Sequence, residues 1–522
     1  MIPIVTPAEM AAIDAAAPEG TDVLVARAGA AVAIAARRMM GGTYGRRVLV
    51  AAGKGNNGAD GRVAAAALER WGVRCRVVTP PEALELVGRA NSERLSRQAK
   101  PWPERPVSAA NKSGKREATK PEGSPIRAGS KMPTSAAWDL VIDAAYGTGL
   151  RGSWGADRAP AAPVLAVDIP SGIDALTGED HGCWPAALTV TFGALKPGLL
   201  LHPGAAAAGE VELAPIGLDA SGAASWLVTD ADADAALPAA EPAAHKWRRA
   251  VRVIAGSPQM RGAGHLVCAA AQQAGAGMVV ASSPGVRAAD VARPAEAVAR
   301  DLRPGEWAGP ALDGIKRFDA AIIGPGIGTD PTAMAQAARF IADCPVPLVV
   351  DADGLTALAD HPECLYERTA PTVLTPHDGE FAKLTGSPPA ADRFDAVSRA
   401  AEEFNVVVLL KGPTTLVAAR AAPEADTTVV LAAAAGTARL ATAGSGDVLS
   451  GMIAAVLSAG ATEPGAVLLQ TAAAAHWHGR TATFGGHGAV AALTPLTAMH
   501  QVELLGTVRA GLAASGAEMS GT

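Results

Sequence analysis

Short runs of continuously apolar residues recur along the chain and alternate with alanine-rich segments of helical periodicity. Such runs are typical of strands that are buried on both faces of a parallel sheet. We expect helices between them, for example over residues 61–71 and 446–459. Strands are expected at residues 47–51, 74–79, 139–143, 164–169 and 188–192 in a first region, and at 251–255, 278–281, 320–323, 347–351, 372–375 and 406–410 in a second. This alternation predicts an α/β protein with two doubly wound domains.

Two segments of different composition interrupt the pattern. Residues 221–244 are rich in Ala, Asp, Pro and Ser, which is typical of a connector between domains. We therefore expect a first domain over residues 1–220 and a second over residues 245–510. Residues 100–135 are dense in Lys, Arg, Pro, Ser and Gly, and they predict a mobile surface insertion between two strands of the first domain.

Composition narrows the class of protein. The 522 residues include 45 Lys and Arg against 51 Asp and Glu, a net charge of −6, so nothing argues for a nucleic-acid partner. The five cysteines are widely spaced without a CxxC pair, which disfavours a disulfide framework or a structural zinc site. We find no signal-peptide pattern, and the apolar stretches are too short to span a membrane. We expect a cytoplasmic homo-oligomer with no nucleic-acid and no membrane partner.

The first candidate for chemistry is the segment 48–61, VLVAAGKGNNGADG, which indicates a strand, a glycine-rich turn and the start of a helix. Such a turn presents backbone N–H groups at a helix N-terminus, where a phosphate can bind. No Lys-Ser/Thr pair follows the last glycine, so the segment is not a Walker A loop. A tight structural turn explains the glycines equally well, but Asn56, Asn57 and Asp60 add polar groups that packing does not require.

Further polar side chains follow predicted strands of the same domain. Asp143 and Asp168 end two strands, and Ser171 stands in the Pro-Ser-Gly turn after the second. A lone acid at such a position is often only a turn former. Because the carboxyl ends of parallel strands meet at one edge of a sheet, we expect these residues and Asn57 to converge. Asn57, Asp143, Asp168 and Ser171 offer hard oxygen donors, which suit an alkali or alkaline-earth cation.

This first region resembles the epimerase domain of the bifunctional NAD(P)H-hydrate repair enzymes, the YjeF N-terminal domain. The resemblance spans about residues 5–218 and rests on AGKGNNGADG, DAAYGTGLRG, AVDIPSGIDALTG and TVTFGALKPGLL. It implies a Rossmann-like fold, potassium bound by Asn57, Asp143 and Ser171, and hydrated NADH or NADPH as substrate. Asp168 is implied as the acid that faces the substrate, and it is the acid/base candidate that we identify in this domain.

The same resemblance implies two loops that bind the hydrate. Ala59 stands where the family usually has glycine, and the insertion over residues 100–135 is a second departure. The implied loop residues are Asn56, Asn57, Gly58, Ala59 and Asp60, and Gly147, Thr148, Gly149, Leu150, Arg151, Gly152 and Ser153.

The second region contains a similar turn. The segment 441–451, ATAGSGDVLSG, is rich in glycine and opens an apolar helix. Backbone N–H groups of residues 444–447 can stabilise a phosphoryl group in transfer. Asp447 can accept a proton from an attacking hydroxyl. The alternative is an acid that only stabilises the helix N-terminus.

Other predicted strand ends in this region carry polar groups. Asp351 and Asp353 follow one strand, and Lys411 follows another with a cation suited to nucleotide phosphates. His377 follows a third strand. An isolated histidine is more often a structural hydrogen-bonding residue, but its position at a strand end beside Glu380 favours a role in the site.

From about residue 245 to 500 the chain resembles the dehydratase domain of the same repair enzymes, which has a ribokinase-like fold. The segments IGPGIG, VVDADG, VLTPHDGE, LKGPTT and ATAGSGD carry this resemblance. It implies ADP as co-substrate, with Mg²⁺ beside it. It also implies contacts with the hydrated cofactor at Ala263, Gly326, Gly328, His377 and Asp447, and with the adenine nucleotide at Lys411, Gly412, Pro413, Thr414, Thr415 and Gly446.

The favoured interpretation is a two-enzyme chain for metabolite repair. One domain interconverts the R and S hydrates of NADH and NADPH, and the other uses ADP to dehydrate the S hydrate to NAD(P)H, giving AMP and phosphate. A small-molecule kinase of the ribokinase type is an alternative, because GSGD is common to that fold, but the fused epimerase-like domain argues against it. A non-catalytic nucleotide-binding or scaffold protein is a third possibility, against which the polar set Asn57, Asp143, Asp168 and Ser171 argues.

Overall fold

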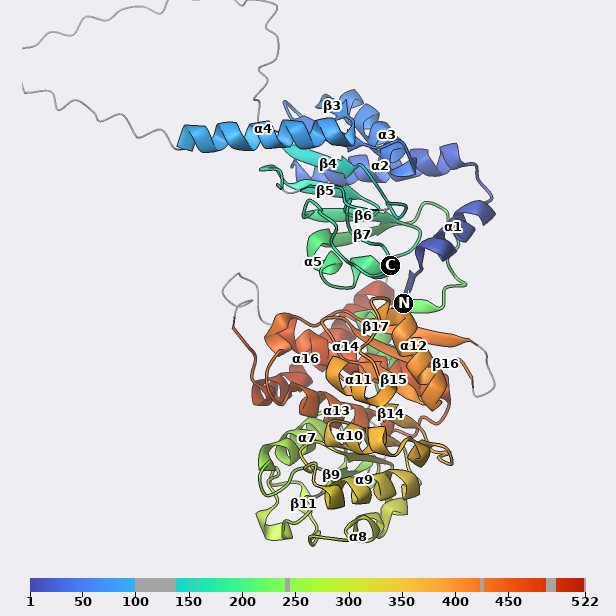
Figure 1. Ribbon diagram of the computed structural model, residues 1–522, viewed down its shortest axis with the longest axis vertical. Coiled ribbons are helices and arrows are strands. Elements are labelled where there is room, and N and C mark those ends of the chain that lie inside the picture. Colours follow the sequence, from blue (N-terminus) through green and yellow to red (C-terminus); the bar gives the residue numbers. More distant parts are fainter. Residues whose placement is uncertain are drawn as a thin grey trace, which may run out of the picture.

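The computed structural model describes residues 1–98, 138–150, 152–156, 158–239, 245–422, 427–484 and 494–520, with backbone only for 92–98 and 515–520. The expected insertion over residues 100–135 lies outside the described residues, as does Arg151. The described chain forms two α/β domains, one stacked on the other in Figure 1. The prediction of an α/β protein with two doubly wound domains is confirmed.

The N-terminal domain has a six-stranded parallel sheet. In sheet order its strands are β3 (Arg74–Val78), β2 (Arg47–Ala52), β4 (Leu140–Ala144), β5 (Val164–Val167), β6 (Leu188–Phe192) and β7 (Glu210–Ala214). Its helices are α1 (Pro7–Ala16), α2 (Thr21–Met39), α3 (Asn56–Arg70), α4 (Pro80–Gln98), the 3-10 helix η1 (Pro197–Leu199) and α5 (Gly204–Ala208). Val48 and Val50 pack with α2 and α3, while Leu49 and Ala51 pack with α4 on the opposite face. Burial on both faces explains the continuous apolar runs.

The C-terminal domain has an eleven-stranded mixed sheet. In sheet order its strands are β1 (Ile2–Ile4), β8 (Ser225–Leu227), β17 (Thr428–Ala433), β16 (Thr415–Arg420), β15 (Val407–Leu410), β14 (Thr372–Leu374), β13 (Leu348–Val350), β12 (Ala320–Ile323), β9 (Ala250–Ile254), β10 (Met278–Ser282) and β11 (Val298–Ala299). From β15 to β11 all neighbours are parallel, so the carboxyl ends of these strands share one edge.

Helices cover both faces of this sheet. On one face lie α6 (Asp230–Ala236), α7 (Arg261–Gln273), α13 (Ser445–Leu457), α14 (Pro464–Thr483) and α16 (Ala498–Ser520). On the other lie α8 (Ala308–Leu312), α9 (Pro331–Asp343), α10 (Asp353–Asp360), α11 (Asp378–Thr385) and α12 (Arg393–Phe404). Short 3-10 helices are η2 (Ala288–Asp290), η3 (Ile315–Arg317), η4 (Pro362–Leu365) and η5 (Ala438–Leu440). The expected helices over 61–71 and 446–459 correspond to α3 and α13.

The expected connector over residues 221–244 contains regular structure. Strand β8 pairs in parallel with β17, and helix α6 packs with α14 and α16, so both belong to the C-terminal layers. The sequence pattern missed them because an Asp- and Ala-rich helix and a three-residue strand lack the long apolar runs of the central strands. Residues 240–244 lie outside the described residues.

The two domains share a core at their junction. Strand β1, at the N-terminus of the chain, pairs with β8 and so joins the C-terminal sheet (Figure 1). Ile4, Leu195, Leu200 and Leu201 belong to the same buried cluster as side chains of the C-terminal sheet. Leu195 and Leu200 lie on either side of η1, so the segment after β6 connects the N-terminal domain with the core of the C-terminal domain.

Candidate active sites

The first site begins at a cluster of oxygen atoms beyond β4 and β5. The Asp143 carboxylate is buried and accepts the Ser171 hydroxyl at 2.6 Å and the Ser171 amide at 2.9 Å. The Asn57 amide nitrogen donates to the carbonyls of Tyr146 at 3.1 Å and Val167 at 2.8 Å. The structure therefore brings Asn57, Asp143 and Ser171 together around the Tyr146 backbone, as the strand-end argument predicted.

The chemistry of this donor set fits a monovalent cation. Asp143 is its only carboxylate, and the other oxygens belong to the Asn57 amide, the Ser171 hydroxyl and the Tyr146 carbonyl, which hard cations prefer. Burial raises the pKa of Asp143 to about 6, although hydrogen bonds from Ser171 and Ala145 lower it. A cation beside Asp143 would favour the ionised carboxylate.

Glycines allow the loops to approach closely. A Cβ on Gly53 would lie 1.9 Å from the Ala145 carbonyl oxygen, and one on Gly58 would lie 2.0 Å from the Gly53 carbonyl oxygen. A Cβ on Gly147 would lie 2.7 Å from the Asn57 amide oxygen. A side chain at Gly53 or Gly147 would separate the turn before α3 from the loop after β4, and one at Gly58 would push α3 away from the end of β2. Gly58 and Gly147, one in each predicted substrate loop, therefore have a steric function.

Asp168, the predicted acid/base residue, lies beside a lysine that the sequence analysis did not select. Lys196 is 1% exposed, and its ammonium group lies 2.5 Å from Asp168 Oδ1. Thr191 donates to the same oxygen at 3.0 Å. Asp168 has a positive φ of 67°, a strained conformation for a residue other than glycine. The lysine in the motif TVTFGALKPGLL, shortly after β6, is the signal that could have identified Lys196.

A second carboxyl group shares the cavity with Asp168. Asp60, in the first turns of α3, is 4% exposed, and burial together with the carboxylates of Asp168 and Asp14 raises its pKa to about 8. The cavity is about 150 Å³ in volume, and its lining includes Asn56, Asn57, Thr148 and Lys196. Three residues of one predicted loop (Asn56, Asn57 and Asp60), Thr148 of the other loop, and Asp168 therefore line the same cavity.

The remaining predicted loop residues lie at the rim or serve the loop itself. Ala59 is half-buried in the first turn of α3, and Leu150 is half-buried in the loop after β4. Gly149 and Gly152 are exposed. The Ser153 hydroxyl donates to the His181 carbonyl at 2.7 Å and accepts the Gly155 amide at 3.0 Å, so it stabilises the loop.

The second site lies at the carboxyl ends of β13, β14 and β15. Lys411, directly after β15, is bonded to Asp351 after β13 at 2.7 Å and lies 3.7 Å from the Glu380 carboxylate. Although burial favours the neutral amine, these two carboxylates raise the pKa of Lys411. A Cβ on Gly446 would lie 3.6 Å from the Lys411 ammonium nitrogen, so the lysine adjoins the first turn of α13.

Asp447 occupies that first turn, and no lysine in the described part of the chain is bonded to it. Helix α13 begins after Gly444, whose φ of 89° suits glycine. Burial and the nearby Asp351 carboxylate raise the pKa of Asp447 to about 6, while Lys411 lowers it. The helix N-terminus, the ammonium group and the carboxylate thus surround one position, which is the arrangement expected for phosphoryl transfer to a hydroxyl.

The glycine loop after β12 lies across from α13. The Gly328 amide donates to Asp353 at 2.9 Å, which ties the loop to the start of α10. A Cβ on Gly326 would lie 3.0 Å from the Cβ of Ala263, so these two predicted residues are neighbours. Both residues are buried, and their contact packs the loop after β12 against the first turn of α7.

His377 acts as a helix cap. Its Nδ1 accepts the amides of Gly379 at 3.0 Å and Glu380 at 3.3 Å, and the Glu380 carboxylate accepts the His377 amide at 2.8 Å. This capping box begins α11. The hydrogen-bonding function that we set against a role in the site is therefore present. The side chain is 60% exposed, and its Nε2 lies 3.5 Å from the Glu380 carboxylate.

The predicted nucleotide segment is held by the other domain. The Thr414 side chain is buried, and its hydroxyl donates to the Leu200 carbonyl at 2.6 Å. Gly412 and Pro413 are exposed, while Thr415 begins β16. The Thr414 hydroxyl is therefore used at the domain junction, and a contact with a nucleotide there would come from the backbone.

Polar side chains beneath α13 fix its first turn. The buried Gln501 accepts the Ser445 hydroxyl at 3.1 Å and pairs with His478 at 2.9 Å. Its amide nitrogen donates to the Leu496 carbonyl at 3.0 Å, and Thr442 donates to the same carbonyl at 2.9 Å. Since a buried polar network is stable only when satisfied, this one specifies where residues 442–447 lie. Sequence patterns gave no signal for it.

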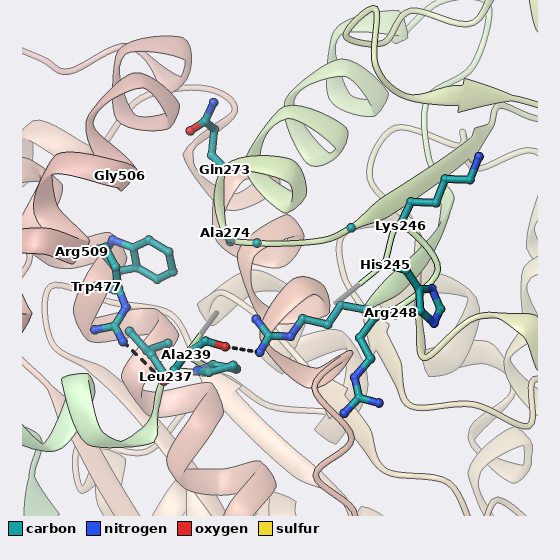
Figure 2. A pocket seen from close by; sticks show the side chains of 14 residues that line it. Leu237, Ala239, His245, Lys246, Arg248, Gln273, Ala274, Trp477, Gly506 and Arg509 are labelled. Carbon is teal, nitrogen blue, oxygen red and sulfur yellow. Dashed lines mark hydrogen bonds between the residues drawn. The ribbon is translucent and has the colours of Figure 1, made fainter. Parts of the chain in front are cut away.

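Figure 2 shows a separate basic cavity, about 540 Å³ in volume, before the amino ends of β9 and β10. Arg249 there donates to the Ala239 carbonyl at 2.5 Å, and Arg509 is paired with Asp234. No predicted site residue lines it. Because the second site lies at the carboxyl ends of the strands, this cavity lies at the opposite edge of the C-terminal sheet.

The described part of the chain lacks two further features. No cluster of three or more His, Cys, Asp or Glu side chains there is arranged to hold a metal ion. Among the same residues, no helix is both long and apolar enough to cross a lipid bilayer.

Comparisons with known proteins agree with the two-domain division. Residues 21–198 match the family model of the YjeF-related protein N-terminus, and residues 251–501 match that of NAD(P)H-hydrate dehydratase. A crystal structure of the ADP/ATP-dependent NAD(P)H-hydrate dehydratase from Bacillus subtilis, with ATP and Mg²⁺, is 28% identical, with a TM-score of 0.43. That likeness covers 54% of this chain and 97% of that one.

Full-length relatives match across both domains. The bifunctional NAD(P)H-hydrate repair enzyme Nnr of Mycobacterium tuberculosis (strain CDC 1551 / Oshkosh) is 41% identical over 430 residues, 80% of each chain. The enzyme of the same name from Moorella thermoacetica is 35% identical over 516 residues, 91% of each chain. The chain belongs to the family of bifunctional NAD(P)H-hydrate repair enzymes.

Proposed function

We propose that this chain repairs hydrated NADH and NADPH in two steps. The N-terminal domain, residues 1–220, interconverts the R and S hydrates. The C-terminal domain, residues 245–510, dehydrates the S hydrate with ADP as co-substrate and releases NAD(P)H, AMP and phosphate. The observation that carries the proposal is the second site, where Asp447, Lys411 and the first turn of α13 surround one position. We also propose that the enzyme acts as a cytoplasmic homo-oligomer.

Dehydration proceeds through a phosphorylated hydrate. Asp447 takes the proton of the hydrate's hydroxyl as the oxygen attacks the terminal phosphoryl group of ADP. The amides of residues 444–447 and the Lys411 ammonium group stabilise the charge on the phosphoryl oxygens, and AMP leaves. The nitrogen lone pair of the nicotinamide ring then expels phosphate, and loss of a proton from the neighbouring carbon forms the double bond. Phosphate is a far better leaving group than hydroxide, which explains the need for a nucleotide.

The phosphates of ADP require a cation as well as protein donors. Lys411 supplies one charge, and Asp351 and Asp353 are oxygen ligands of the kind that Mg²⁺ prefers in phosphoryl transfer. When bound, Mg²⁺ would neutralise phosphate charge. The nucleotide is proposed to lie beside Gly412, Pro413, Thr414, Thr415 and Gly446. The hydrate is proposed to lie beside Ala263, Gly326, Gly328 and His377.

In the N-terminal domain we propose that Asn57, Asp143 and Ser171 hold potassium. The oxygen-only donor set with one charge supports this assignment. The cation would fix the loop after β4 against α3 and so shape the cavity that receives the hydrate. The substrate is proposed to lie between two loops, one with Asn56, Gly58, Ala59 and Asp60 and the other with residues 147–153.

The test uses the purified full-length chain with hydrated NADH. Addition of ADP should restore the absorbance of the dihydronicotinamide and release AMP and phosphate in equal amounts. Repeating the assay with ATP measures the nucleotide preference. A ribokinase-type kinase would instead accumulate a stable phosphorylated product without dihydronicotinamide, and a scaffold protein would give no turnover; either result contradicts the proposal.

A further inference from the structure

The cavity of the first site contains two acids in different electrostatic surroundings. Asp168 is bonded to Lys196 and Thr191. No hydrogen bond or ion pair among the described residues reaches the carboxyl group of Asp60, although that side chain is 4% exposed and lines the cavity. A buried carboxyl without a cation or donor is most stable in its neutral form, whereas one held by a lysine is most stable ionised.

The groups around Asp60 strengthen this difference. The titratable side chains that line the cavity with it are Asp14 from α1, Asp168 from the loop after β5 and Lys196 from the segment after β6. Burial, Asp168 and Asp14 together raise the pKa of Asp60 to about 8. At neutral pH Asp60 is therefore largely protonated, while Asp168 is paired with Lys196. Two carboxyl groups in such different surroundings suit acid and base roles in an enzyme.

Epimerisation of a hydrate needs both a proton donor and a proton acceptor. The R and S hydrates differ at the ring carbon that carries the added hydroxyl, next to the ring nitrogen. Their interconversion requires that carbon–oxygen bond to break and to form again on the other face. The nitrogen lone pair can expel the oxygen and leave a cationic carbon–nitrogen double bond, but hydroxide must first be protonated to leave as water.

We propose that Asp60 is the general acid of the epimerase site, and that Asp168, paired with Lys196, is the carboxylate that faces the cationic ring. This inference rests on the proposed epimerase function. Asp60 gives its proton to the leaving hydroxyl, which departs as water. When water adds to the other face, Asp168 takes the released proton, which returns to Asp60 within the shared cavity. One proton is given and one is recovered, and the nitrogen lone pair is restored.

The size of the cavity fits the hydrated ring of the substrate and not the whole molecule. Its volume of about 150 Å³ is below the roughly 300–1,000 Å³ of pockets that enclose whole ligands. It can therefore receive the hydrated ring, while the turn before α3 offers N–H groups for the phosphates. Asn56, Asn57 and Thr148 in the lining come from the loops on either side of the ring position.

The decisive variant is Asp60→Asn, which keeps the side-chain size and removes the proton. We expect kcat for epimerisation to fall by ~10²–10⁴-fold, the usual effect of losing a general acid, with KM changed by less than about threefold. Dehydration of the S hydrate by the same sample should continue at the wild-type rate. Glu69→Gln, on the exposed end of the same helix, makes the same charge change away from the cavity and should leave epimerisation unchanged.

The pH profile separates acid catalysis from binding. Because Asp60 acts when protonated, the wild-type rate of epimerisation should decline as pH rises through about 8, and Asp60→Asn should lack this decline. Asp14→Asn removes a carboxylate that raises the pKa of Asp60, so the decline should move to lower pH.

These outcomes distinguish failure of the inference from failure of the proposed function. A wild-type chain that does not interconvert the hydrates would refute the epimerase function itself. If the wild type interconverts them and Asp60→Asn keeps its kcat, or only raises KM, Asp60 is not the acid. Should Asp60→Asn lose dehydration as well, indicating misfolding, an unshifted profile in Asp14→Asn would refute the inference.

Discussion

The two active sites use the same elements and distribute charge differently. In each, a glycine-rich turn opens a helix, α3 or α13, at the carboxyl edge of a parallel sheet, and a lysine lies beside a strand-end aspartate. In the N-terminal site Lys196 is paired with Asp168, one of the two acids between which the cavity chemistry is divided. In the C-terminal site Lys411 neutralises Asp351, and the helix carboxylate Asp447 is left without a lysine bonded to it.

The position of the lysine therefore decides which carboxyl group can exchange a proton. Among the described residues, neither Asp60 on α3 nor Asp447 on α13 is bonded to a lysine, and burial raises both pKa values, to about 8 and about 6. The first remains protonated at neutral pH and suits an acid, whereas the second is ionised and suits a base. Similar architecture thus serves opposite directions of proton transfer.

The variant with the largest expected effect should impair dehydration and leave epimerisation unchanged. Asp447→Asn keeps the size of the side chain but cannot accept a proton, so ADP-dependent dehydration should fall by ~10²–10⁴-fold. Epimerisation, followed by separating the two hydrates chromatographically, should remain at the wild-type rate. Undiminished dehydration in this variant would show that Asp447 is not the base.

A smaller effect is expected from the cation cluster of the N-terminal domain. Asp143→Ala removes its carboxylate and two hydrogen bonds to Ser171, and we expect epimerisation to slow by about 10–100-fold, the range seen when a metal site is perturbed. Dehydration should not change. Replacing potassium with a bulky organic cation should slow the wild-type enzyme in the same way, and cation binding can be followed by calorimetry. Full activity in both experiments would exclude the potassium site.

The pH dependence of dehydration tests the contrast in pKa values. Asp447 works as an ionised base, so activity is present above its pKa of about 6 and is lost as pH falls through that value. At pH 5 about a tenth of the molecules would hold it ionised, and the dehydration rate should fall about tenfold relative to pH 7. Epimerisation should instead decline on the alkaline side. A dehydration rate that is flat between pH 5 and 7 would contradict the assignment.

The smallest effect concerns the domain junction. Thr414→Val removes the hydroxyl bonded to Leu200 and keeps the side-chain shape. A hydrogen bond contributes a net free energy of about 1 kcal/mol, which corresponds to about a fivefold change in affinity. We therefore expect KM for ADP to rise by about that factor while kcat is retained. Ser398→Ala on the exposed surface of α12 is the control. An unchanged KM would mean that the junction does not support the nucleotide segment.

Much of the fold and of both sites could be predicted because the signals are local. Central strands such as β6 and β12 match their predicted ranges, since burial on both faces demands continuous apolar runs. Strand β8 and the hairpin of β16 and β17 were not predicted, because short or Ala-rich strands lack that signal. Asn57, Asp143 and Ser171 met as expected, since parallel strands bring their carboxyl ends to one edge.

The sequence by itself determined which residues stand at the strand ends and at the starts of α3 and α13. Only the tertiary structure decided their charge. The raised pKa of Asp60 depends on burial, and the ion pair of Asp168 depends on Lys196, 28 positions later in the chain, folding back to within 2.5 Å. Thr414 likewise meets Leu200 across 214 residues. Desolvation and ion pairing are set by distant groups brought together in space, which no local pattern encodes.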